Sequence, residues 1–99
     1  MTEKESLYLQ LSEECSEVSH RISKLLRFGP DEVQEGNTIE TNSERLRYEI
    51  NDALAVLRLL EEYGYVNKPS TQELQEHYLM KREKVIRYLN YSKSLGIIK

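Results

Sequence analysis

The interpretation of this chain rests on two stretches, LSEECSEV at residues 11–18 and LRYEINDAL at residues 46–54. Each contains two acids three residues apart, Glu14 with Glu17 and Glu49 with Asp52. Residues three apart on a helix share one face. Both pairs also lie within apolar residues at helical spacing. Two such pairs that faced each other would form a cage of four carboxylates, which is a site for a hard cation.

Three segments have the apolar spacing of helices, and they are predicted over residues 3–28, 42–63 and 71–93. Each follows a capping box, in which a hydroxyl residue and a glutamate three positions later satisfy the first backbone N–H groups. The boxes are Thr2 with Glu5, Thr41 with Glu44, and Ser70 with Glu73. Glycines at 29 and 64 end the first two helices. Residues 29–42 connect them, and a helical turn or a short strand over 37–40 is left open.

These segments predict an all-α fold with one domain over residues 1–99, in which three long helices form a bundle that dimerisation completes. A chain of 99 residues buries only a modest core by itself. The apolar tail after residue 94 is expected to dock on the body of the protein or on a second subunit.

The acids of the two stretches are expected to face protein rather than water. Glu14 lies between Leu11 and Val18 on one apolar seam, where an unpaired carboxylate costs several kcal/mol. Glu17 adds a like charge, so a cation is the simplest remedy. Glu49 and Asp52 continue a second apolar stripe of the helix over 42–63, which predicts a helix buried on two sides.

Carboxylates without nearby histidine or cysteine favour Mg²⁺, with Mn²⁺ as an alternative. Four of them exceed the charge of one divalent ion, which indicates two or more metals or one metal with a basic residue. Arg21 and Lys24, on the Glu17 side, could supply part of that positive charge, although a surface ion pair and a surface lysine explain them more simply. Lys81 and Lys84, three residues apart, suit a polyphosphate, and the simpler reading is lysines that reach to solvent.

Composition excludes several classes of protein. The net charge of −3 argues against a nucleic-acid partner. No apolar run reaches the ~18 residues of a membrane span, and no signal-peptide pattern opens the chain. The one cysteine, Cys15, allows no internal disulfide and fits a reducing compartment, so a cytoplasmic location is expected.

The residues Glu13-Glu14-Cys15-Ser16-Glu17 followed by Glu49-Ile50-Asn51-Asp52 resemble the EExxE…ExxD signature of MazG-like nucleotide pyrophosphohydrolases. That all-α group includes dimeric dUTPases and phosphoribosyl-ATP pyrophosphohydrolase. The resemblance covers about residues 7–63. It implies Mg²⁺-dependent hydrolysis between the α and β phosphates of a nucleoside triphosphate, which yields a monophosphate and pyrophosphate.

The resemblance also implies roles for individual residues and an oligomeric state. The implied metal ligands are Glu14, Glu17, Glu49 and Asp52. Glu13 and Glu14 are the catalytic candidates, with Glu13 either as the base or as a residue that supports the metal ligands. Asn51, which stands where the family often has Gly or Ser, is a candidate for substrate contact. The lysines Lys24, Lys81 and Lys84 are further substrate-binding candidates, from their charge and spacing and not from the resemblance. A homodimer or a homotetramer is expected.

Two other functions stay open at this point. The chain could be a non-catalytic helical module that binds nucleotide, metal or a partner protein. Within the enzymes, it could be a specialised pyrophosphohydrolase that acts on phosphoribosyl-ATP or dUTP.

Overall fold

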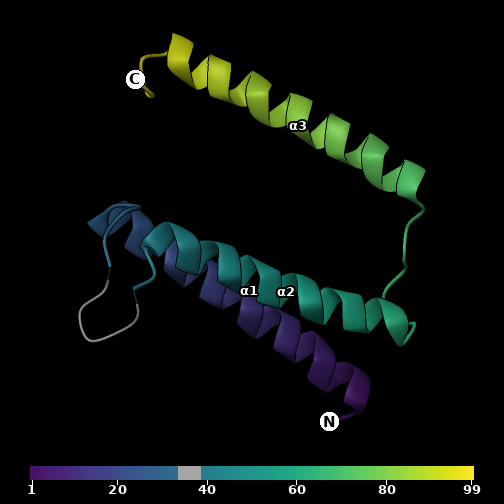
Figure 1. Cartoon of the computed structure of the whole chain (residues 1–99). Coiled ribbons are helices and arrows are strands. Elements are labelled where there is room, and N and C mark those ends of the chain that lie inside the picture. Colours follow the sequence, from purple (N-terminus) through teal and green to yellow (C-terminus); the bar gives the residue numbers. More distant parts are fainter. Residues whose placement is uncertain (34–38) are drawn as a thin grey trace. The chain divides into compact units, whose positions relative to one another are not determined.

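The computed structural model describes residues 1–33 and 39–99. Over these residues the protein consists of three helices and no strand, so the predicted all-α class is confirmed (Figure 1). The helices are α1 (Glu3–Phe28), α2 (Asn42–Glu62) and α3 (Thr71–Ser94). Their bounds agree with the predicted ones to within one residue.

All three predicted capping boxes are present, and they explain where the helices begin. Before α1, Thr2 Oγ1 accepts from the Glu5 N–H at 3.1 Å, and the Thr2 N–H donates to Glu5 Oε1 at 3.2 Å. The Thr2 hydroxyl and N–H lower the pKa of the Glu5 carboxyl. The Ser70 N–H and hydroxyl do the same to the pKa of Glu73 at the start of α3.

Residue 29 ends α1 as predicted. Gly29 has φ 93°, a conformation that favours glycine, and its N–H donates to the Leu25 carbonyl at 2.9 Å. An isolated antiparallel bridge between Val33 and Thr41 then closes the connection just before α2. The turn or strand considered over 37–40 falls partly outside the described residues.

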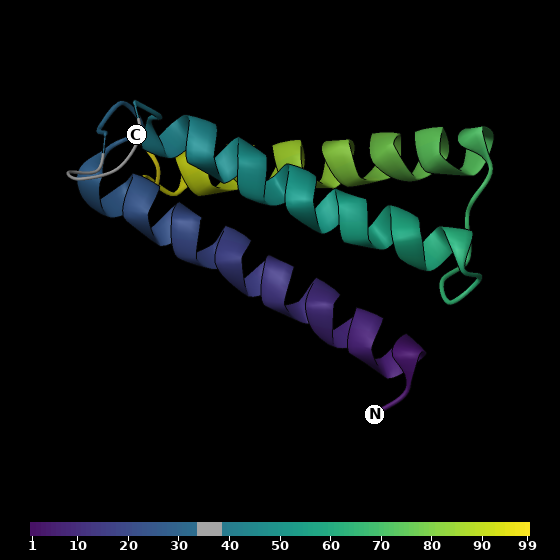
Figure 2. The ribbon, with the colours of Figure 1, turned by 60° about the horizontal axis from the view of Figure 1, so that its bottom comes forward.

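The chain divides into two compact units, Met1–Asn67 and Lys68–Lys99. The single domain over 1–99 stays a prediction. In the first unit α1 and α2 run antiparallel, side by side (Figures 1 and 2). The α1 seam alternates spacings of four and three residues, and its members are at least half-buried: Leu7, Leu11, Glu14, Val18, Arg21 and Leu25.

Hydrogen bonds fasten both ends of this helical hairpin. At one end Tyr8 Oη donates to the Tyr65 carbonyl at 2.7 Å, and Tyr65 Oη donates to Glu3 Oε1 at 3.1 Å. The Glu3 carboxylate raises the pKa of Tyr65. At the other end the buried Asn42 Nδ2 donates to the Gly29 carbonyl at 3.0 Å, and also to Glu32 Oε2 at 2.7 Å. The two helices are therefore held in one register.

The prediction that α2 is buried on two sides is met only in part within the first unit, where Val56 and Leu59 of its second apolar stripe are half-buried. Among the described residues Leu60 is the one hydrophobic side chain that is fully buried. At the ends of that second stripe Tyr63 is 52% exposed and Asp52 is exposed as well. The physical reason is that α1 is the one helix that contacts α2 among the described residues, and a single neighbour covers the second stripe incompletely. Burial by a further helix or a second subunit stays a prediction.

The second unit contains α3, which has no buried residue. Large apolar side chains of its predicted seam are open to solvent, with Tyr78 60% and Val85 51% exposed. The bundle that dimerisation would complete stays a prediction. None of the described helices combines the length and the hydropathy that a membrane span requires.

Candidate metal centre

Three carboxylates from two helices meet at the middle of the hairpin. Glu14 of α1 and Glu49 and Asp52 of α2 each offer one oxygen, and these oxygens lie within 4.8 Å of one another. We call these three residues the carboxylate triad. Glu14 and Glu49 are half-buried, whereas Asp52 is exposed, so the triad opens from the helix seam to solvent.

The local sequence explains how each member reaches this place. Glu14 occupies a seam position of α1 between Leu11 and Val18, so the packing of α1 on α2 turns it toward α2. Glu49 and Asp52 lie one turn apart on the same face of α2. The antiparallel arrangement then brings the two segments together. Gln10 Nε2 donates to Glu14 Oε1 at 2.9 Å, which restrains the Glu14 carboxylate and leaves its other oxygen for a ligand.

The triad concentrates negative charge. Two carboxylates 4.8 Å apart repel each other by about 1 kcal/mol in water and by roughly 3–4 kcal/mol at the lower effective dielectric of a protein surface. A cation would relieve this repulsion. All the donors are oxygens, which suits Mg²⁺ or Mn²⁺, and three carboxylates leave coordination positions for water or for substrate oxygens. The donor set therefore fits the metal that the sequence predicts.

Two predicted members of the acidic site lie outside this group. Glu17 and Glu13 are both exposed, and the three clustered carboxylates do not include them. Glu17 lies one turn beyond Glu14 but off the seam, which continues through Val18 and Arg21. The described residues therefore bring together three of the four predicted metal ligands.

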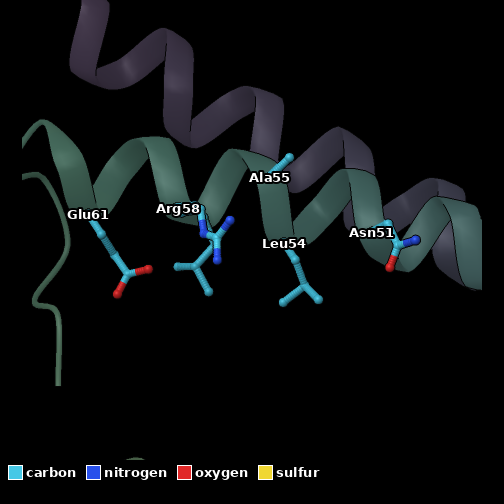
Figure 3. A pocket seen from close by; sticks show the side chains of 6 residues that line it. Asn51, Leu54, Ala55, Arg58 and Glu61 are labelled. Carbon is cyan, nitrogen blue, oxygen red and sulfur yellow. The ribbon is translucent and has the colours of Figure 1, made fainter. Parts of the chain in front are cut away.

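The predicted substrate-binding residues line hollows on the surfaces of single helices. Asn51 belongs to a hollow of about 360 Å³ on the outer side of α2, where Leu54 and Glu61 project to one side (Figure 3). Lys24 lines one of about 150 Å³ on α1. Lys81 and Lys84 line one of about 260 Å³ on α3. Their roles toward substrate stay predictions.

The sequence interpretation misplaced Arg21. A surface pair with Glu17 was the simpler expectation, but Arg21 is only 8% exposed and is the one buried residue of α1. The heptad spacing carried the signal, because Arg21 follows Glu14 by seven residues and therefore shares its seam. Arginine side chains are usually exposed, and this position is an exception to that tendency.

Comparison of the chain with protein-family models, with curated proteins and with solved structures gave no match. The resemblance to MazG-like pyrophosphohydrolases therefore remains a prediction from the residues themselves.

Proposed function

We propose that the protein is a Mg²⁺-dependent nucleoside triphosphate pyrophosphohydrolase that converts a (d)NTP to a (d)NMP and pyrophosphate. One observation carries the proposal: Glu14, Glu49 and Asp52, from two different helices, present oxygens within 4.8 Å of one another. These are three of the four metal ligands that the resemblance to MazG-like enzymes implies. The lone cysteine fits a cytoplasmic location.

The triad would hold the metal, with Mn²⁺ as a substitute for Mg²⁺. When bound, such an ion neutralises charge on the triphosphate and lowers the pKa of coordinated water. The chain's own residues then have separate tasks. Glu14 and Glu49 anchor the site from the seam, and the exposed Asp52 forms its open side. Glu13, exposed next to Glu14, is the candidate that accepts a proton from the attacking water.

Substrate binding would fall to residues outside the triad. Asn51 immediately precedes Asp52, so it is the nearest candidate for contact with the nucleotide. Lys24, Lys81 and Lys84 offer ammonium groups for the outer phosphates. Kinetics can separate substrate binding by these lysines from metal binding by the triad. Replacing a phosphate-binding lysine by alanine should raise KM more than it lowers the affinity for metal.

We also propose that the active form is a homodimer, and a tetramer of two dimers would be consistent with the same surfaces. Its support is the exposed apolar surface of the described chain, where Leu60 is the one fully buried hydrophobic residue. Exposed apolar area of this extent marks interaction surfaces in folded proteins. Sedimentation at several concentrations would measure the oligomeric state directly.

The test is a product assay with Mg²⁺ and each common NTP and dNTP, with dUTP and phosphoribosyl-ATP included. We expect pyrophosphate and no free phosphate. Glu49→Gln and Asp52→Asn should abolish turnover and keep the helical circular dichroism signal. Glu76→Gln, which removes an exposed carboxylate of α3, is the matched control and should turn over at the wild-type rate.

Two outcomes would refute the proposal. Wild-type rates in both triad variants would mean that these carboxylates are not the catalytic site. Tight nucleotide binding without any turnover would instead favour a non-catalytic nucleotide-binding module.

A further inference from the structure

The one buried residue of α1 is a charged one. Arg21 is 8% exposed, whereas its apolar neighbours on the seam, Val18 and Leu25, are only half-buried. Its Nε and Nη1 atoms are buried and have no hydrogen-bond partner in the described chain. Burying a guanidinium without partners is costly, and an apolar side chain of similar length would usually be more stable there. The presence of an arginine at this position therefore needs an explanation.

Arg21 lies on the same seam of α1 as Glu14, the member that α1 contributes to the carboxylate triad. It follows Glu14 by seven residues, which is two helical turns or about 10 Å along the axis. Long side chains on a helix lean toward its N-terminus, which from Arg21 is the direction of Glu14. The residue between them on the seam is Val18. Because the apolar Val18 lies between them, the interaction of the Arg21 guanidinium with the Glu14 carboxylate is screened less than it would be in water.

The net charge of the triad together with Arg21 matches the charge of one divalent ion. The three carboxylates of the triad carry three negative charges, and Arg21 contributes one positive charge. The two negative charges that remain equal what a single divalent cation neutralises. The sequence alone indicated either several metals or one metal with a basic residue, and the buried position of Arg21 favours the second arrangement.

We propose that Arg21 is a fixed counter-charge of the carboxylate triad, which adapts the site to one divalent ion per chain and weakens that ion's binding. Arg21 touches neither the metal nor the substrate, so it acts as a positioning residue for charge. The inference rests on the metal site of the proposed function, but it concerns metal binding alone and is tested without turnover.

The experiment is a Mn²⁺ titration that combines calorimetry with the electron paramagnetic resonance signal of free Mn²⁺. Wild-type protein should bind one Mn²⁺ per chain. Arg21→Met should bind its first Mn²⁺ about tenfold more tightly, because the positive charge of Arg21 no longer repels the ion that the carboxylates attract. Arg21→Gln, a second neutral variant, should show the same gain if the methionine variant folds poorly. Arg21→Lys should stay within about twofold of wild type.

Arg47→Gln is the matched control. Arg47 lies two residues before Glu49 on α2, and its side chain is exposed. The Arg47→Gln variant therefore removes the same net charge as the Arg21 variants, but from a position where water screens its interaction with the triad. We expect its affinity to stay within about twofold of wild type. Equal effects of the Arg21 and Arg47 variants, unchanged affinity in both neutral Arg21 variants, or two ions per wild-type chain would each overturn the inference. Absence of any Mn²⁺ binding by wild type would instead refute the metal site and, with it, the proposed function.

Discussion

Glu14→Gln should make the metal-free protein more stable while removing its response to metal. In the absence of an ion, the Glu14 carboxylate is repelled by both Glu49 and Asp52 at 4.8 Å or less. Each repulsion amounts to about 1 kcal/mol if water screens it fully, and more if it does not. The triad is partly exposed, so we take a value near the aqueous limit. Relief of the two repulsions outweighs the loss of the more distant attraction to Arg21, and it stabilises the protein by about 1–2 kcal/mol. The glutamine also keeps an oxygen that can accept from Gln10.

The assay is thermal unfolding by circular dichroism, in EDTA and again with millimolar Mg²⁺ or Mn²⁺. A gain of about 1–2 kcal/mol should raise Tm by roughly 4–16 °C in EDTA for a chain of this size. Added metal should raise the Tm of wild type, since an ion that binds only the native state stabilises it by mass action. The variant should respond much less.

Glu76→Gln is the matched control for this prediction. Glu76 accepts a hydrogen bond from Gln72 at 3.1 Å, four residues earlier, just as Glu14 does from Gln10 at 2.9 Å. It lies on α3 and is not a member of the triad. Its replacement should leave both the Tm in EDTA and the metal response near wild type. The reasoning fails if Glu14→Gln lowers Tm in EDTA, or if it keeps the full metal response.

Three further predictions concern the fold. Leu60→Ala should cost about 2–5 kcal/mol of unfolding free energy in urea titrations, because Leu60 is fully buried, whereas Leu54→Ala at a 52% exposed position should cost under about 1 kcal/mol. Asn42→Ala should cost about 1–3 kcal/mol by the same titration through loss of the bonds to Gly29 and Glu32, and Asn42→Asp should be worse than wild type since it places a second carboxylate by Glu32. The caps of α1 and α3 should weaken in acid: folding lowers the pKa of Glu5 and Glu73, so their contribution is complete above the unfolded pKa and is lost as pH falls through the folded value. NMR titration should give each glutamate a lower pKa in the folded protein than in an unfolded peptide of the same sequence. A pKa at or above the peptide value would contradict the capping geometry.

The helices were predictable because residues next to each helix end determine where the helix begins or stops. A hydroxyl residue three positions before a glutamate forms a capping box, which marks a helix start through hydrogen bonds within four consecutive residues. The same holds for Gly29, whose left-handed φ ends α1. The observed bounds therefore agree with those that the sequence predicts.

Burial was harder to predict because it depends on neighbours that the sequence does not position. The apolar stripes of α2 suggested two covered faces, but in the first unit the second stripe is only half-buried at Val56 and Leu59, and Asp52 is exposed. The acids of the triad were found from their spacing and their apolar surroundings. The burial of Arg21 was not predicted, although its spacing from Glu14 places it on the seam, because arginine side chains are usually exposed. The position of Glu17 outside the triad depends on how α1 packs on α2, which the spacing of acids within one helix does not define.

The hairpin of α1 and α2 also has a consequence for how the protein folds. The triad is assembled by two helices that are consecutive in the chain, and the connection between them spans only residues 29–41. Closing a loop of this length costs little entropy, and contacts this local in sequence form early and quickly. The carboxylates are therefore in place once the hairpin exists, before α3 or a second subunit is needed. A divalent ion present during synthesis could bind the nascent hairpin and speed its formation, which stopped-flow refolding with and without Mn²⁺ would detect.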